Sequence, residues 1–140
     1  MESGKESKRG GWRPSTPLLW VFLATTVLIP ALGGAVTETD FEAKTTQNLL
    51  NLCTVPPNDP YYREAINFCE GYLVGAYQYY VSEIGDDTRE AFVCLPTPPP
   101  SRNEAVRMFI AWAQARPQYL HERPVETEFR FLTEQWPCQR

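Results

Sequence analysis

The sequence predicts an all-α fold: a small four-helix domain with two disulfides. Three observations support this prediction. Apolar residues recur at helical spacing in four separate segments of the chain. Prolines stand at the joints between these segments, where they end one helix or open the next. The chain has 4 cysteines, an even number, and in an exported protein this pattern indicates paired thiols.

Residues 1–35 have the pattern of a secretory signal peptide. A basic stretch comes first, an apolar run covers residues 18–32, and small residues occupy positions 33–35. The apolar run contains Pro30 and is shorter than the roughly 20 residues that a membrane-spanning helix needs. We therefore expect cleavage instead of an uncleaved membrane anchor, which leaves residues 36–140 as one helical domain.

The charge of that domain excludes two classes of partner. Removing residues 1–35 takes away four of the 13 Lys and Arg residues and two of the 17 Asp and Glu residues. The remaining 9 positive and 15 negative side chains give a net charge of −6. Phosphates would be repelled, so we expect no nucleic-acid partner and no membrane partner after cleavage. The negative charge is consistent with a basic protein partner, and equally with a charge that serves only to keep the protein soluble.

The first two helices are separated by a proline-rich joint. Residues 45–53 form a short amphipathic helix that we expect to begin near Asp40. Three prolines within residues 56–60 end it. Asp59 fits an N-cap that has proline at the first helical position, so the second helix is predicted over residues 61–83.

The second half of the domain contains two more helices. Residues 91–96 form a short extended piece, and Pro98–Pro100 forms a stiff polyproline connector. Ser101 opens the third helix with a capping box, and Pro117 ends it. The fourth helix opens at Pro124. The expected apolar positions are Val106, Phe109, Ile110 and Ala113 on the third helix, and Val125, Phe129, Leu132 and Trp136 on the fourth.

The second helix carries two glycines, Gly71 and Gly75, and each costs roughly 0.5–1 kcal/mol in a helix interior. At about 100° per residue they lie opposite the core stripe, on the same side as Tyr79. Small residues four apart let another backbone approach closely. We expect this face to contact another helix of the same chain or, failing that, the mate in a homodimer. The core stripe itself consists of Cys69, Leu73, Ala76 and Tyr80.

The chain lacks the residue patterns of familiar enzymes. Its one histidine, His121, lies in a proline-flanked loop and is interpreted first as a linker side chain. The sequence contains no Gly-rich phosphate loop, no nucleophile elbow, no metal-binding histidine pair and no C-x-x-C pair. We therefore expect a protein that is not an enzyme and that uses no cofactor and no metal.

Four short pieces follow one another in order along the chain. They are Leu49-Leu50-x-x-Cys53, Cys69-x-Gly71-Tyr72-x-x-Gly75, Phe92-x-Cys94-Leu95-Pro96 and Trp136-Pro137-Cys138. Together, over residues 45–138, they resemble the Rap/Tai family of type VI secretion amidase immunity proteins. The resemblance implies a periplasmic helical domain with paired cysteines and a tendency to form homodimers. It also implies a protein partner, a secreted peptidoglycan amidase, that the domain binds and inhibits.

Four cysteines allow three disulfide pairings. In an antiparallel arrangement the end of the fourth helix lies near the start of the third, which favours a Cys94–Cys138 bond. That choice leaves Cys53 to pair with Cys69, while the other two pairings stay open.

Inhibition of an enzyme requires a rigid projection that fits a catalytic cleft. Two loops are the least committed to the predicted core, namely residues 82–91 and residues 117–124. Acidic side chains in the first loop would complement a basic enzyme and speed encounter, or they are simply solvated. The candidate contacts are Glu83, Asp86, Asp87 and Glu90 in the first loop, and Tyr119, His121 and Glu122 in the second.

A different class of function stays open. A periplasmic stress chaperone could use a similar small disulfide-bearing helical frame. Such a protein would release apolar surface at low pH, when its carboxylates become protonated. Dye binding that rises sharply below about pH 3–4 would favour it. An adaptor role without a small ligand is the third alternative.

Overall fold

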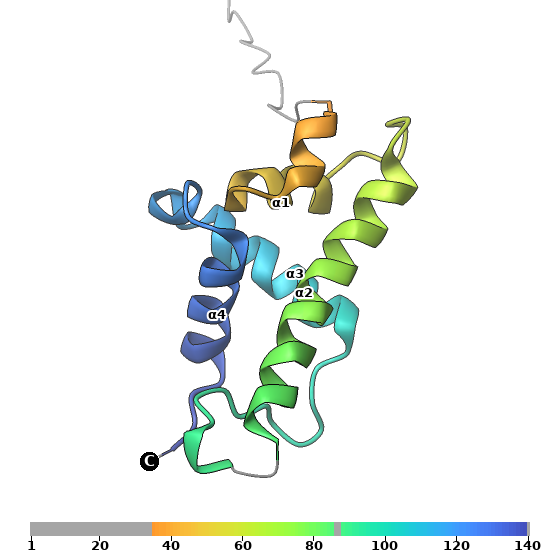
Figure 1. The fold of residues 1–140 in the computed structure, drawn as a ribbon. Helices are drawn as coiled ribbons and strands as arrows, with labels where there is room; N and C mark the ends of the chain where they lie inside the picture. The colour runs from red at the N-terminus through yellow and green to blue at the C-terminus, as the bar shows by residue number, and fades with distance from the viewer. Residues whose placement is uncertain (1–34, 86–87, 140) are drawn as a thin grey trace, which may run out of the picture. The chain divides into compact units, whose positions relative to one another are not determined.

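The structure of the chain, a computed structural model, describes residues 35–85 and 88–139. Four α-helices follow one another: α1 (Thr46–Cys53), α2 (Tyr62–Ile84), α3 (Arg102–Gln114) and α4 (Pro124–Gln135). Figure 1 shows them with three short 3-10 helices, η1 (Glu38–Glu42), η2 (Thr88–Glu90) and η3 (Pro117–Tyr119). The all-α prediction is confirmed, since the described part of the chain has no strand beyond an isolated bridge between Val93 and Pro137.

The expected signal peptide lies almost wholly outside the described residues, and its cleavage stays a prediction. Within residues 35–85 and 88–139, no helix is both long and apolar enough to cross a membrane.

The first α-helix begins at Thr46, so the expectation that it begins near Asp40 is wrong. Ala43 has φ of 45°, in the left-handed region, and separates η1 from α1. Asp40 is buried, and its carboxylate accepts hydrogen bonds from Thr37, Asn48 and Asn51. Although burial raises the pKa of Asp40, these hydrogen bonds together hold it below its ordinary value. Asp40 therefore fastens η1 to α1 instead of opening a longer helix.

The start of α2 also differs from the prediction. The N-cap position belongs to Tyr61, whose side chain makes no capping hydrogen bond. Asp59 instead accepts the backbone N–H of Tyr61 at 2.8 Å and the backbone N–H of Val36 at 3.3 Å. Asp59 therefore orders the turn before the helix and joins it to the start of the domain. At the other end, Gly85 stops α2 with φ of 56°, where glycine is favoured.

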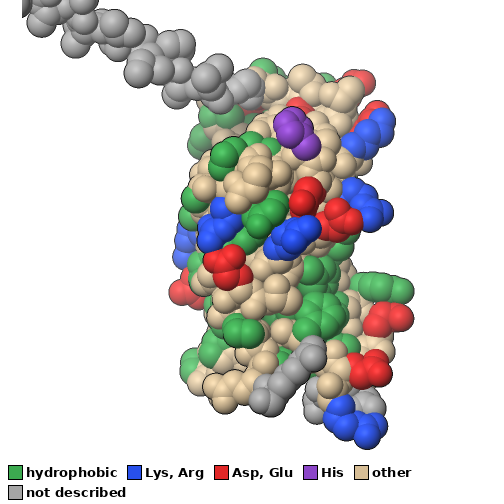
Figure 2. Space-filling view, turned by 90° about the vertical axis from the view of Figure 1, so that its left-hand side faces the viewer, with side chains coloured by type: hydrophobic (Ala, Val, Ile, Leu, Met, Phe, Trp, Pro, Cys, Tyr) green, Lys and Arg blue, Asp and Glu red, His purple; other side chains and the backbone are tan. Residues whose placement is uncertain are grey.

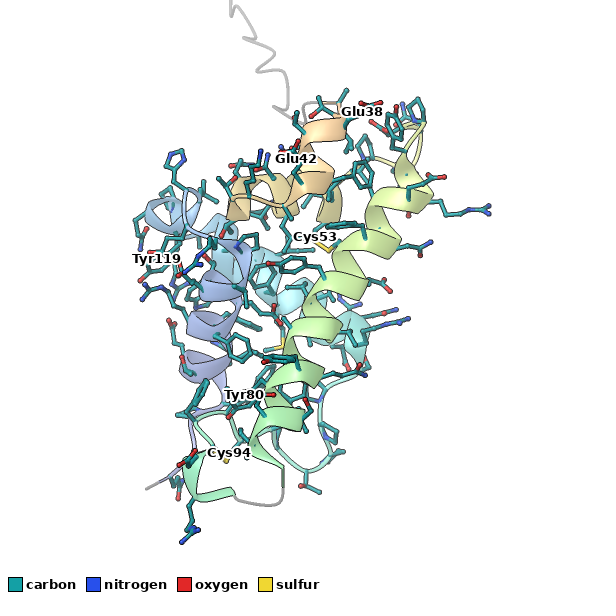
Figure 3. The ribbon with its side chains drawn as sticks, in the orientation of Figure 1. Glu38, Glu42, Cys53, Tyr80, Cys94 and Tyr119 are labelled. Carbon is teal, nitrogen blue, oxygen red and sulfur yellow. A yellow bond between two sulfur atoms is a disulfide. The ribbon has the colours of Figure 1, made fainter. Side chains whose placement is uncertain are left out.

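Both disulfides that the helix layout favoured are present. Cys53 of α1 is bonded to Cys69 of α2 at an S–S distance of 2.04 Å, and Cys94 is bonded to Cys138 at 2.02 Å. Figure 3 shows the first bond between α1 and α2 and the second beside the C-terminal end of the described chain. The core stripe of α2 is confirmed as well, because Cys69, Leu73 and Tyr80 are buried, with Ala76 half-buried.

The third helix matches its prediction more closely than the fourth. The Ser101 capping box is present at the start of α3, where Phe109 and Ala113 are buried and Val106 and Ile110 are half-buried. On α4 only Leu132 of the four predicted core positions is buried, and the other three are half-buried. The buried face is rotated, and it consists of Pro124, Thr127, Glu128, Phe131 and Leu132.

The extended piece predicted over residues 91–96 pairs with the chain after α4. The backbone N–H of Cys94 donates to the carbonyl of Trp136 at 2.8 Å. The Tyr80 hydroxyl accepts the backbone N–H groups of Phe92 and Val93 at 2.8 and 3.0 Å. Together with the Cys94–Cys138 bond, these contacts join the C-terminal ends of α2 and α4.

Candidate partner-binding site

The residues predicted to contact a partner form two separate groups. The loop of residues 117–123 leads into the N-terminal end of α4, whereas Glu83 and Glu90 lie at the other end of the helices (Figure 1). A helix of 12 residues, the length of α4, spans about 18 Å. Asp86 and Asp87 lie outside the described residues. The structure therefore offers two candidate surfaces rather than one.

The loop of residues 117–123 is firmly attached to α1, so the prediction that it is little committed to the core is wrong. The backbone N–H of Thr46 donates to the carbonyl of Glu122 at 2.8 Å, and that of Gln47 donates to Leu120 at 3.0 Å. These are the free N–H groups at the start of α1, which a helix leaves without partners of its own. Beneath them the buried hydroxyls of Thr46 and Thr127 are hydrogen-bonded at 2.7 Å.

Two of the three candidate side chains in this loop support the loop itself. The Tyr119 ring stacks on Trp112 with ring centroids 5.6 Å apart and planes 5° from parallel. The guanidinium of Arg130 lies over the Tyr119 ring at 5.1 Å and donates to both oxygens of Glu122 at 2.9 and 3.3 Å. Figure 3 shows Tyr119 at the outer edge of the domain. Tyr119 and Glu122 therefore hold the loop in one conformation.

His121 is different from its two neighbours. Its side chain is exposed, and within the described ranges it makes no hydrogen bond or ion pair. It is the purple side chain at the surface in Figure 2. Of the three candidates, His121 is the one whose side chain is available to another molecule.

The exposed side of α4 carries charges of both signs. Arg116 forms an ion pair with Glu134 at 2.6 Å. At the N-terminal end of α4, Arg123 forms an ion pair with Glu126, three residues further along the chain. In Figure 2 basic and acidic side chains lie next to one another on this face. Exposed pairs of this kind contribute little to stability, but they leave the face close to neutral. The acidic candidates Glu83 and Glu90, both exposed, belong to the other surface.

The glycine face of α2 is open. A Cβ atom added to Gly71 or Gly75 would meet nothing within 4 Å. Tyr79, which shares that side of the helix, is 66% exposed. The expectation that another helix of this chain packs on the face is wrong, because α2 packs through the opposite stripe. Contact with a homodimer mate stays a prediction.

An apolar groove of about 330 Å³ lies between α2, α3, α4 and the proline connector. Its lining includes Leu73, Val106 and Phe131, and also one acidic residue, Glu128. Glu128 is only 3% exposed, and burial raises the pKa of its carboxyl to about 9. The sequence analysis missed this residue, since one glutamate on a helix rich in charged residues carries no local signal of burial.

Comparison with known proteins identifies the family. A family model described as Rap1a immunity proteins matches residues 45–138. The matched span contains α1 to α4 and all four cysteines. No curated protein and no solved structure matches the chain. The match confirms the resemblance stated on the four sequence pieces and favours an immunity role over the stress-chaperone alternative. The chain belongs to the family of Rap1a immunity proteins.

Proposed function

We propose that this protein acts in the periplasm, where it binds a secreted peptidoglycan amidase and inhibits it. Membership of the Rap1a family supports an immunity role and an effector protein as partner. The signal-like N-terminus and the two disulfides support a periplasmic location, since disulfides persist in oxidising compartments. The amidase as target rests on the resemblance to the Rap/Tai proteins.

The observation that carries this proposal is the ordered loop of residues 117–123. Two backbone hydrogen bonds join the loop to α1, and the Tyr119–Trp112 stack supports it from below. A loop that is already ordered loses little conformational entropy when it enters a cleft, so more of the contact energy appears as affinity. His121 stands exposed on this loop, and we propose it as the side chain that enters the catalytic cleft of the amidase.

Co-expression tests the proposal directly. The full chain is produced together with each member of a panel of peptidoglycan amidases exported to the periplasm, and growth is measured. We expect one class of amidase to be neutralised, with a complex that survives size-exclusion chromatography. If every amidase stays toxic and none is bound, an amidase is not the target.

A pair of variants then tests the role of the loop. His121→Ala should weaken the complex about tenfold or more, as a buried interface side chain does when it is truncated. Asn103→Ala, at an exposed position at the start of α3, is the matched control and should leave the affinity unchanged. Equal affinities for both variants would refute the loop as the inhibitory element. Both variants should keep the melting temperature of the parent protein, because neither side chain is buried.

We also propose the open face of α2 as a homodimer contact. The absence of any neighbour within 4 Å of Gly71 and Gly75 and the exposure of Tyr79 support it. Gly75→Leu should give a monomer by light scattering while the melting temperature is kept, since the added Cβ atom has no neighbour within 4 Å in its own chain. Ala111→Leu, an exposed small residue on α3, should leave the oligomeric state unchanged. A dimer that persists in Gly75→Leu would exclude this face.

A further inference from the structure

The groove beside α4 has the size and composition of a small-molecule site. Ligand sites are mostly apolar hollows of about 300–1,000 Å³ with a few well-placed polar groups. This groove, at about 330 Å³, lies at the lower end of that range. Leucine, valine, phenylalanine and proline side chains from three helices and the connector form its walls. The family match and the proposed amidase contact leave the groove without a role.

Glu128 is the buried acidic group of the groove. Its side chain comes from the buried face of α4 and reaches the cavity between apolar residues such as Phe131 and Leu73. The Oε2 atom is buried, and within the described residues it has no hydrogen-bond partner. A buried polar atom without a partner is destabilising and is rare in native proteins. A bound molecule that supplied the partner would remove this cost.

The chemistry of the walls limits what that molecule can be. A charged ligand would lose its hydration among apolar side chains. Arg102, the one basic residue among the described residues that line the groove, already pairs with Glu70 at 3.3 Å. Glu128 is protonated at neutral pH, because burial raises its pKa to about 9, and a neutral carboxyl both donates and accepts a hydrogen bond. A neutral ligand with a matching donor and acceptor satisfies both requirements.

We propose that this groove binds a small uncharged molecule with an apolar body and one hydrogen-bonding head group, which pairs with the carboxyl of Glu128. A primary amide matches this carboxyl best, because its N–H donates to one carboxyl oxygen while its carbonyl accepts the carboxyl proton. The exposed residues Gln78, Pro99 and Arg102 form the mouth through which the ligand enters. This function is separate from the loop of residues 117–123 and holds whether or not that loop binds an amidase.

Two ligands that differ only in the head group test the proposal. The protein is produced from the full sequence under oxidising conditions, purified and titrated with 4-butylbenzamide and with 4-butyltoluene, while backbone amide shifts are followed by NMR. We expect shifts confined to residues around the groove, and at least about tenfold tighter binding of the benzamide, because its amide makes two hydrogen bonds with the carboxyl that the toluene cannot make. If neither ligand binds, or if both bind equally, the proposal is overturned.

Four variants separate the anchor from the cavity. Glu128→Leu should lose the tenfold preference while still binding 4-butyltoluene, and Glu128→Gln should keep the preference, since its amide also donates and accepts. Ala105→Phe places a ring in the groove and should abolish binding of both ligands. Ala111→Phe, exposed on the same helix, is its control and should bind as the parent does. Loss of binding in Ala111→Phe, or an unchanged preference in Glu128→Leu, would contradict the assignment.

Discussion

Replacing Glu128 by glutamine should stabilise the protein at neutral pH. Glu128 is 3% exposed, and burial raises its pKa from 4.5 to about 9. Between these two values the native protein holds a proton that the unfolded chain has released. The free energy of unfolding therefore falls by about 1.4 kcal/mol per pH unit over this window. The contribution of the Glu128 proton to the free energy of unfolding is fully present below pH 4.5. About 3 kcal/mol of this contribution is lost by pH 7.

Glutamine has no proton to release, so Glu128→Gln should be about 3 kcal/mol more stable than the parent at pH 7. The gain should shrink toward pH 5 and grow toward pH 8.5. One other titratable side chain near the carboxyl has a shifted pKa. Tyr72 faces Glu128 from α2, where burial and then the charge of Glu128 raise the tyrosine pKa above 10.0, outside this window.

Urea unfolding of both proteins at pH 5, 7 and 8.5 measures the effect. Glu126→Gln is the control, because Glu126 is exposed and its pair with Arg123 lowers its pKa, so it stays ionised across the whole range. This control should keep the pH slope of the parent. A Glu128→Gln protein with the parent's stability and slope would show that Glu128 is ionised in the native protein, and the reasoning from burial would be refuted.

Three further predictions concern contacts between distant parts of the chain. Tyr80→Phe should cost about 2 kcal/mol in chemical denaturation, because two backbone N–H groups lose their acceptor. Replacing Cys94 and Cys138 by serine opens a loop with a sequence separation of 44 and should cost about 4 kcal/mol, measured by the same method under non-reducing conditions. Thr46→Val should lower the free energy of unfolding by about 1–2 kcal/mol and speed amide exchange in residues 117–123, because the hydrogen bond to Thr127 is lost. The control Thr46→Ser keeps the hydroxyl and should show neither effect. Unchanged exchange in the valine variant would show that other contacts hold the loop.

Local patterns determined most of the secondary structure. The capping box at Ser101 and the proline at Pro124 set the starts of α3 and α4 to the residue, because both signals act within one helical turn. The stripe through Cys69 determined which side of α2 is buried. The antiparallel order of the helices favoured the observed disulfide partners without excluding the other two pairings, and the resemblance over residues 45–138 indicated the family.

Prediction from the sequence was wrong where a contact between residues far apart in the chain decided which side chains are buried. Thr127 is buried because Thr46, 81 residues away, supplies its hydrogen bond. The spacing of apolar residues along one helix cannot indicate such a distant partner. The same packing rotates α4 and draws Glu128 into the core, where it becomes the polar group of an apolar groove. The backbone bonds from α1 to residues 117–123 are equally long-range.

The sequence by itself therefore indicated the helices, most of their joints, the buried side of α2 and the family of this protein, and it favoured the observed cysteine pairs. Only the tertiary structure decided which side of α4 is buried, which cysteine pairing forms, which loop is held rigid and which surfaces stay open. The glycines of α2 show the physical reason. Their spacing allows a close neighbour, but whether one is present depends on where the other helices pack, and here they pack on the opposite side.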